Sequence, residues 1–194
     1  MKLSIGLLFC LLVASCASNH SGLDEFQIKT QYLGCDGDIA LDVHAHAEAG
    51  DVKSARLLLL EKCGLSADVL TEAALLAKEE GDHDEYVRRA LQALRKRDTT
   101  SPIKVLALGF EVSEELVNEG SELSLEKART AGSDMRYIAP QWPSGYLILA
   151  AVEVKQGNVD AGLEYLKEGK QATGHYMFDR HINVIEAQLQ PAEE

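Results

Sequence analysis

The chain has 194 residues, 46% of them hydrophobic, and its 31 acidic residues outnumber 19 basic ones, which gives a formal net charge of −12 at pH 7. Such a charge argues against nucleic acids and anionic lipid headgroups as partners, because both would be repelled. The length fits one compact domain that buries roughly two thirds of the surface of its unfolded chain.

An apolar segment near the N-terminus has the layout of an export signal. The run from Leu3 to Val13 follows a lysine and precedes small residues, and it is too short to span a bilayer. Residues 13–16 then read Val-Ala-Ser-Cys, which resembles the bacterial lipobox. In that family the signal is cleaved before the cysteine, which is acylated and becomes the new N-terminus.

The lipobox resemblance implies a cleaved signal peptide over residues 1–15, a lipid on Cys16 and a flexible tether over residues 16–30. Ordinary signal cleavage after Ala17 is the alternative, because small residues also occupy both positions that such a site requires. A lipid on the cysteine would anchor the protein stably, since each buried methylene contributes about 0.8 kcal/mol. Ala17 is not an aspartate, which by the family's sorting rule in Gram-negative cells implies the periplasmic face of the outer membrane.

The cysteine count fits an exported protein. Of the four cysteines, Cys10 would leave with the signal and Cys16 would carry the lipid, so Cys35 and Cys63 remain as an even pair. Disulfide bonds persist in oxidising compartments outside the cytosol. We therefore expect a disulfide between these two residues, with two unpaired buried thiols as the alternative.

The rest of the chain shows helical periodicity in paired segments. Three turns share one chemistry, with Glu-Ala-Gly-Asp at 48–51, Glu-Glu-Gly-Asp at 79–82 and Lys-Gln-Gly-Asn at 155–158. Glycine ends one helix in the left-handed conformation, and the following Asp or Asn can cap the next helix. Apolar residues recur at helical spacing on both sides of each turn, with little alternation of period two. We therefore predict antiparallel helical hairpins and no strands.

This pattern resembles the tetratricopeptide repeat, a pair of antiparallel helices about 34 residues long. The best copy covers residues 143–176, where Tyr146 holds the large aromatic position and Gly157 makes the turn. Gly162 and Gly169 depart from the motif, which prefers alanine at both positions.

The tetratricopeptide resemblance implies an all-α fold. We expect a short right-handed superhelix of about four antiparallel hairpins over residues 31–190, closed by an amphipathic capping helix at its C-terminal end. An earlier copy would run from Gly109 to Trp142, with Ala128 at its small position, but it has no turn glycine in register. The sequence therefore does not fix the exact repeat register over residues 99–140.

The hairpin arrangement gives a second reason for Cys35 and Cys63 to pair. They stand at the start of the first helix and the end of the second, and these two ends lie side by side in an antiparallel hairpin. A bridge would contribute about 3–4 kcal/mol by the chain-entropy argument. It would stabilise a terminal repeat, which has one neighbour to pack on.

Candidate chemistry is sparse. His44 and His46 lie near Asp42 and Glu48, but residues two apart on a helix point in nearly opposite directions. His44 would therefore face Glu48, and His46 would face Asp42, whereas a zinc site needs three or four convergent ligands. The basic run at residues 95–97 lies at an expected helix C-terminus, where positive charge suits the helix dipole. We predict no metal, no cofactor, no nucleic acid and no enzymatic activity.

Stacked hairpins of the resembled family form a concave surface that is lined by the first helix of each pair and binds extended peptides or helices. The matching residues of this chain are His44, Glu48, Leu75, Glu79, Ala151 and Lys155. With the lipid anchor, the resemblance predicts a scaffold or adaptor that holds another envelope protein, in envelope, pilus or secretion-system assembly. Two alternatives remain: a structural lipoprotein without a groove ligand, and a metal-dependent or enzymatic helical domain that uses His44 and Glu48.

Overall fold

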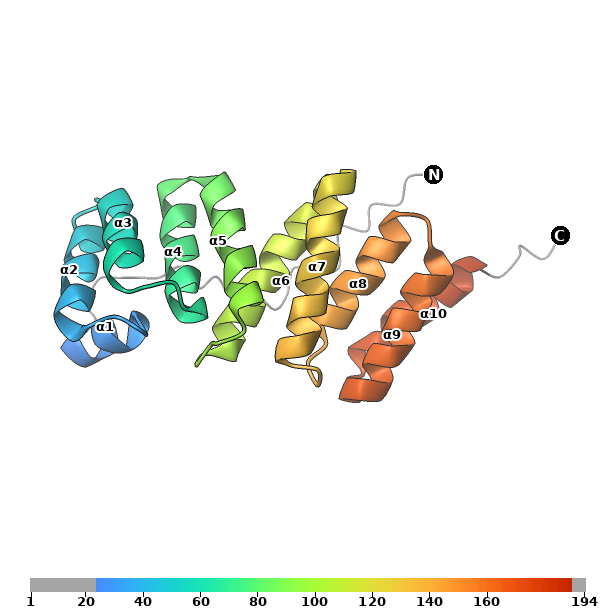
Figure 1. The fold of residues 1–194 in the computed structure, drawn as a ribbon. Coiled ribbons are helices and arrows are strands. Elements are labelled where there is room, and N and C mark those ends of the chain that lie inside the picture. Colours follow the sequence, from blue (N-terminus) through green and yellow to red (C-terminus); the bar gives the residue numbers. More distant parts are fainter. Residues whose placement is uncertain (1–23, 190–194) are drawn as a thin grey trace. The chain divides into compact units, whose positions relative to one another are not determined.

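The structure is a computed structural model that describes residues 24–189, and Figure 1 shows it as a ribbon. Every regular element in this range is an α-helix, so the predicted all-α class is confirmed, and no strand occurs among the described residues. The expected signal peptide, the expected lipid site Cys16 and most of the expected tether lie outside the described residues. No helix within residues 24–189 combines the length and the hydrophobicity needed to cross a membrane.

The chain divides into two compact units, Met1–Ala107 and Leu108–Glu194. Unit 1 holds α1 to α5 and the start of α6, and unit 2 holds the rest of α6 and α7 to α10. The helices are α1 (Glu25–Gln31), α2 (Gly37–Glu48), α3 (Val52–Lys62), α4 (Ala67–Glu80), α5 (His83–Lys96), α6 (Pro102–Glu119), α7 (Glu122–Ile138), α8 (Ser144–Lys155), α9 (Val159–Thr173) and α10 (Met177–Leu189).

The two tight turns of unit 1 have the chemistry that the sequence predicts. Gly81 ends α4 with a φ of 82°, a left-handed conformation that favours glycine, and Asp82 accepts a hydrogen bond from the backbone N–H of Glu85 at 3.2 Å. Gly50 and Asp51 repeat this arrangement between α2 and α3. Each turn reverses the chain, so α2 packs on α3 and α4 packs on α5 as hairpins (Figure 1).

The turns before α7 and α9 differ from this expectation. Gly157 has a φ of 87°, and Asn158 takes the N-cap position of α9, but its side chain makes no capping hydrogen bond there and its amide N–H donates to Glu153 Oε2 at 2.9 Å. Asn158 is therefore the expected N-cap residue, but the expected side-chain capping bond is wrong. The turn before α7 is made by Gly120, which has a φ of 74°, and by Ser121, which caps α7. This turn lies in the region in which the sequence does not fix the repeat register.

The N-terminal hairpin of unit 1 is closed covalently. Cys35 lies just before α2 and Cys63 is the C-cap of α3, and the two cysteines form a disulfide with their Cα atoms 4.6 Å apart. The predicted pairing is therefore confirmed. A buried apolar cluster adjoins the bridge, and its members are Ile28, Tyr32, Ala40, Val43, Ala47, Ala55, Leu59, Val69, Ala73 and Leu76.

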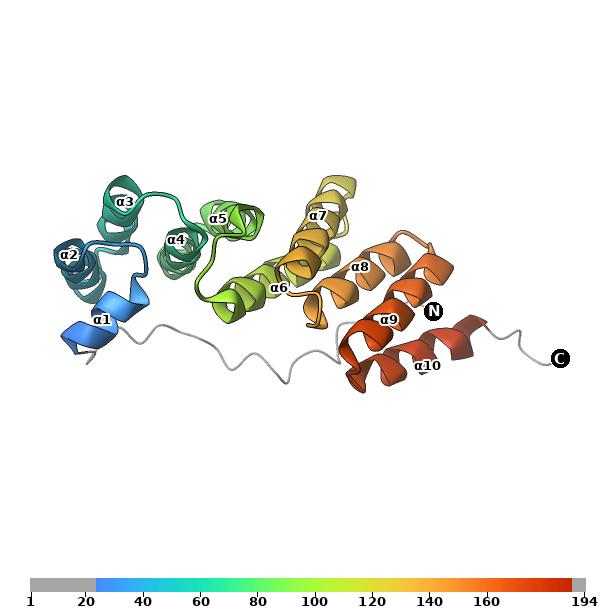
Figure 2. The ribbon, with the colours of Figure 1, turned by 60° about the horizontal axis from the view of Figure 1, so that its bottom comes forward.

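Helix α1 occupies residues that the sequence assigns to the end of the tether. Asp24 and Gln27 form a capping box, in which each side chain accepts a hydrogen bond from the backbone N–H of the other residue. Ile28 and Tyr32 are buried in the apolar cluster of unit 1. Figure 2 shows α1 beside α2, so an ordered helix precedes the first hairpin.

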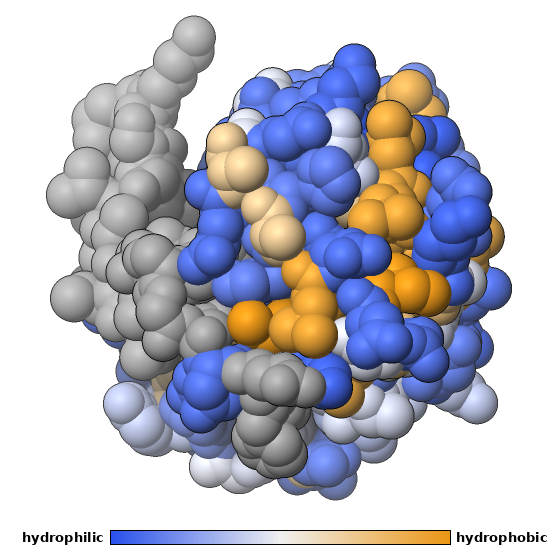
Figure 3. Space-filling model, turned by 90° about the vertical axis from the view of Figure 1, so that its left-hand side faces the viewer, coloured by the Kyte–Doolittle hydropathy of each residue, from blue (hydrophilic) through white to orange (hydrophobic). Residues whose placement is uncertain are grey.

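One end of unit 1 carries a hydrophobic patch. Figure 3 faces the end at which α2 and α3 lie, and it shows apolar side chains among polar ones. On these two helices Leu41, Val52 and Leu60 are partly buried, and Leu57 is exposed.

Close packing in unit 2 explains the two glycines that depart from the repeat motif. A Cβ at Gly169 on α9 would lie 2.6 Å from the ring of Phe178 on α10 and 2.8 Å from the Cβ of Tyr146 on α8. A Cβ at Gly162 would lie 2.6 Å from the side chain of Val154. Figure 2 shows α9 and α10 side by side, and an alanine at either position would push packed helices apart.

Candidate functional site

The predicted groove residues of unit 1 lie on α2 and α4. His44 is buried on α2, and its Nε2 atom lies 3.5 Å from Oε1 of Glu48, one turn later. The pairing of His44 with Glu48 that helical spacing predicts is therefore confirmed. Glu79 is exposed near the end of α4, and Leu75 is half-buried one turn before it.

Tyr32, which no sequence motif identifies as a site residue, links α2 to α4. It follows α1, and its ring centroid lies 6.5 Å from that of His44 in an edge-to-face arrangement. Its hydroxyl is buried and has no hydrogen-bond partner among the described residues. Burial raises the pKa of Tyr32, and the carboxylates of Glu72, Glu79 and Glu48 raise it further.

We call Tyr32, His44, Glu48, Glu72 and Glu79 the Tyr32 cluster. Glu72 is buried on α4, and its carboxylate accepts a hydrogen bond from Nζ of Lys104 on α6 at 2.7 Å. Glu48 and Glu79 are exposed. The cluster thus combines a buried aromatic pair, one buried carboxylate and two exposed carboxylates. The capping-box pattern at residues 24–27 is the sequence signal that could have pointed to α1 and hence to Tyr32.

The remaining predicted groove residues belong to α8 of unit 2. Ala151 is half-buried and Lys155 is exposed. The Lys155 side chain runs beside the turn before α7, because a Cβ at Gly120 would lie 2.9 Å from Lys155 Cε. The structure therefore brings together His44, Glu48 and Glu79 in unit 1, and it places Ala151 and Lys155 in the other unit.

The histidine pair on α2 does not form a joint site. His46 is exposed and its Nδ1 atom lies 3.4 Å from Oδ2 of Asp51 in the turn, so Asp51 rather than the expected Asp42 is the carboxylate beside it. No group of three or more His, Cys, Asp or Glu side chains within residues 24–189 is arranged to hold a metal ion.

A partly buried ionic network connects the two hairpins of unit 1. Arg56 on α3 donates to Oε2 of Glu80 at 2.6 Å, and its guanidinium lies 3.0 Å from Oε1 of Glu85. Burial alone would raise the pKa of Glu85, but hydrogen bonds from Arg89 and Arg88 outweigh it and hold the pKa below its ordinary value. A carboxylate that stays ionised in this way stabilises the fold and is poorly suited to proton transfer near neutral pH.

Asp68 organises the connection between α5 and α6. Its buried carboxylate accepts hydrogen bonds from the Thr99 hydroxyl at 2.6 Å, from the Thr100 backbone N–H at 2.9 Å and from the Thr100 hydroxyl at 2.7 Å. Burial would raise the pKa of Asp68, but these hydrogen bonds outweigh it and lower the pKa. This acid also has a structural role, since its oxygens are occupied by the loop that it holds.

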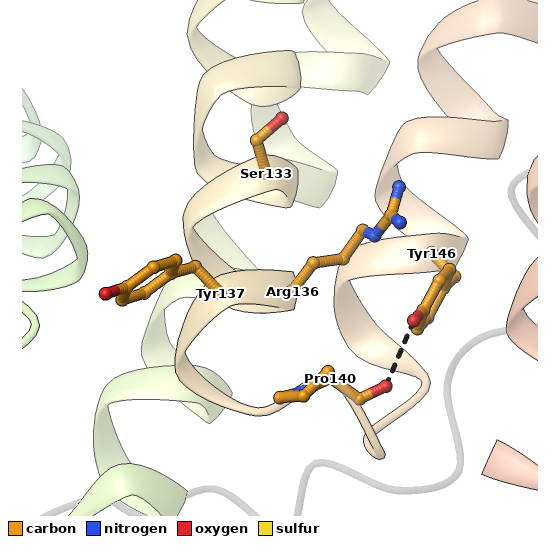
Figure 4. Close-up of a pocket in the computed structure, with 5 residues that line it drawn as sticks. All are labelled: Ser133, Arg136, Tyr137, Pro140 and Tyr146. Atoms are coloured by element: carbon orange, nitrogen blue, oxygen red, sulfur yellow. Dashed lines mark hydrogen bonds between the residues drawn. The ribbon is translucent and has the colours of Figure 1, made fainter. Parts of the chain in front are cut away.

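Unit 2 has a pocket of about 320 Å³ where α7 meets α8. It is lined by Ser133, Arg136, Tyr137, Pro140 and Tyr146, which Figure 4 shows as sticks. Arg136 points toward Tyr146, with its guanidinium 4.6 Å from the ring centroid, while Tyr137 leaves α7 on the other side. Arg136 is also ion-paired with Glu168 on α9, so its charge is already compensated. The Tyr146 hydroxyl donates to the Pro140 carbonyl at 3.1 Å, which ties the loop to α8.

Unit 1 has a second pocket, of about 260 Å³, which we call the α4–α5 pocket. Its lining residues are Leu65, Leu70, Arg89, Gln92, Arg95 and Lys96. The basic residues Arg95 and Lys96, whose charge complements the helix dipole at the C-terminal end of α5, therefore also line a pocket together with two leucines.

Comparison of this chain with models of protein families, with curated proteins and with solved structures found no match.

Proposed function

We propose that this protein is a non-enzymatic interaction scaffold of the cell envelope. A lipid on Cys16 would anchor it to the outer membrane, with the helical units facing the periplasm. The disulfide between Cys35 and Cys63 supports an exported location, and the lipobox resemblance supports the anchor. Hairpins of the tetratricopeptide type, stacked as a superhelix, would present the first helix of each pair to a partner.

The Tyr32 cluster is the observation that carries this proposal. It gathers His44, Glu48 and Glu79 from α2 and α4, the first helices of two successive hairpins. These are the positions at which the resembled family binds peptides. The buried acids of unit 1 that lie outside the cluster, Asp68 and Glu85, are engaged in structural bonds, which favours binding over catalysis.

The cluster favours a partner segment that carries lysine or arginine. Glu48 and Glu79 are exposed carboxylates, and the net charge of −12 would steer a cationic segment toward them. The Tyr32 hydroxyl could accept a hydrogen bond from such a segment once the side chains that cover it move aside. We therefore expect a basic segment of another envelope protein as the ligand.

The experiment is chemical cross-linking in native envelopes, followed by quantitative mass spectrometry of what purifies with the tagged protein. The test variant is Glu48→Ala combined with Glu79→Ala. The control is Glu61→Ala combined with Glu126→Ala, which removes two exposed acids outside the cluster and so changes the net charge equally.

We expect one envelope protein to be enriched with the wild type and the control, to be lost with the test variant, and to cross-link through a basic segment. Equal recovery from the test variant would remove the cluster from the interface. The absence of any enriched protein, despite correct fractionation with the envelope, would contradict the scaffold and favour the structural lipoprotein.

A further inference from the structure

The α4–α5 pocket combines apolar walls with exposed positive charge. Leu70 on α4 is 1% exposed, whereas Leu65, in the loop after α3, is 48% exposed although its side chain is large and apolar. Arg95 and Lys96 lie in the last turn of α5, and both are exposed. An apolar centre with a charged rim is the usual anatomy of a protein interface.

Two of the three cationic side chains that line this pocket form no ion pair with a carboxylate of the described residues. Arg89 is ion-paired with Glu85 and donates to Gln92 at 3.1 Å, so its charge is compensated. Arg95 and Lys96 form no ion pair or side-chain hydrogen bond with any described residue. Both suit the dipole at the C-terminal end of α5, but that local role does not account for the exposed leucine beside them.

We propose that the α4–α5 pocket is a docking site for a protein segment that carries one apolar side chain next to aspartate or glutamate. The pocket volume of about 260 Å³ is large enough to receive an apolar side chain. Leu65 and Leu70 would cover that side chain, while Arg95 and Lys96 would pair with the flanking carboxylates. The site goes beyond the Tyr32 cluster, which favours a cationic partner and shares no residue with this pocket.

Charge favours a protein segment over a membrane surface as the occupant. The net charge of −12 would repel an extended anionic bilayer, and two cations attract such a surface weakly. A short acidic segment meets less repulsion, because salt screens charges that are farther away than about 8 Å. Arg95 and Lys96 line the pocket and would be in direct reach of the carboxylates of such a segment.

Peptide selection tests this site directly. A random peptide library displayed on phage is selected on the purified full-length protein, on the Arg95→Ala/Lys96→Ala variant and on a Lys53→Ala/Lys62→Ala control. The control removes two exposed lysines of α3 that do not line the pocket. We expect the wild type and the control to enrich peptides with Leu, Ile or Phe beside Asp or Glu, and the pocket variant to lose them.

One enriched peptide is then measured by fluorescence polarisation. We expect about tenfold weaker binding to the Arg95→Ala/Lys96→Ala variant, and weaker binding to the wild type at high salt. Leu65→Ser should also weaken binding while the circular dichroism of the protein stays unchanged, because the Leu65 side chain is largely outside the core.

The proposal is overturned if the wild type enriches basic or uncharged peptides, if the acidic set persists on the pocket variant, or if no peptide is enriched. Co-sedimentation with phosphatidylcholine vesicles provides the membrane comparison. Binding that requires added phosphatidylglycerol and disappears in the pocket variant would assign the site to a membrane surface and overturn the peptide proposal.

The Glu48→Ala/Glu79→Ala variant separates this inference from the proposed function. It should lose the envelope partner and still bind the acidic peptide, because the two surfaces share no residue. A failed peptide selection therefore leaves the cross-linking result intact, and a failed cross-linking experiment leaves the peptide result intact.

Discussion

The guanidinium of Arg56 on α3 lies 3.0 Å from the carboxylate of Glu85 on α5, and both side chains are buried. The same guanidinium donates to Glu80 at the end of α4. Glu80 and Glu85 flank the turn of the second hairpin, so one arginine from the first hairpin holds both sides of that turn. The packing of α3 on α4 therefore has an ionic component as well as an apolar one.

Replacing Arg56 with methionine should destabilise unit 1. The substitution keeps an unbranched apolar stem but leaves Glu80 and Glu85 without their shared partner. We expect a loss of about 3 kcal/mol, at the lower end of the range for buried pairs, because Arg89 still neutralises Glu85. Urea denaturation followed by circular dichroism measures the change. Arg180→Ala, at an exposed position on α10, is the control, and a loss for Arg56→Met as small as the control's would contradict a structural role for the pair.

Acid should destabilise the protein in part through Asp68. Its pKa is lowered in the folded state, so its stabilising contribution is fully present above the pKa of the unfolded chain and is lost as the pH falls through the lower folded value. We expect Asp68→Asn to lose stability at neutral pH and to lose less than the wild type between neutral pH and about pH 3. Urea denaturation across that range measures both slopes.

Glu164→Gln is the matched control for this titration, since Glu164 is an exposed acid on α9. The free energy of unfolding of this variant should depend on pH in the same way as that of the wild type. If Asp68→Asn also showed the pH dependence of the wild type, hydrogen bonding by the Asp68 carboxylate would not contribute to the acid sensitivity.

An alanine at Gly169 should destabilise unit 2 despite its better helix propensity. Propensity alone would stabilise α9 by about 1 kcal/mol. The new Cβ, however, would meet the buried ring of Phe178 and the Cβ of Tyr146, and neither atom can move without shifting a helix. We expect a net loss of about 1–3 kcal/mol, as for other overpacked cores, measured by thermal unfolding.

Gly37→Ala provides the comparison for this prediction. A Cβ there would meet the end of the Lys29 side chain, which can move at little cost, so the variant should be at least as stable as the wild type. A stabilised Gly169→Ala protein would mean that the close approach of α9 to α8 and α10 is relieved by a small shift of the helices.

The proposed anchor predicts a specific effect of Cys16→Ser. The wild type should incorporate labelled palmitate and fractionate with the outer membrane, and the variant should do neither. Cys10→Ser is the control and should behave as the wild type does, because Cys10 lies within the expected signal. A wild-type protein that carries no lipid and stays in the soluble periplasmic fraction would favour ordinary cleavage after Ala17.

The all-helical class, the hairpin turns of unit 1 and the disulfide follow from the sequence by itself. Each depends on local chemistry: a left-handed glycine beside a capping aspartate at Gly50 and Gly81, and two cysteines at the outer ends of one hairpin. The pairing of His44 with Glu48 is equally local, because residues four apart on a helix share a face.

Tertiary packing alone decides the remaining features. Tyr32 reaches His44 because a short helix folds back on the first hairpin, and Arg56 meets Glu85 because two hairpins stack. The residues in these contacts come from different helices or helix caps, so helical periodicity does not predict which of them meet. Their proximity is set by how the helices pack in the folded chain.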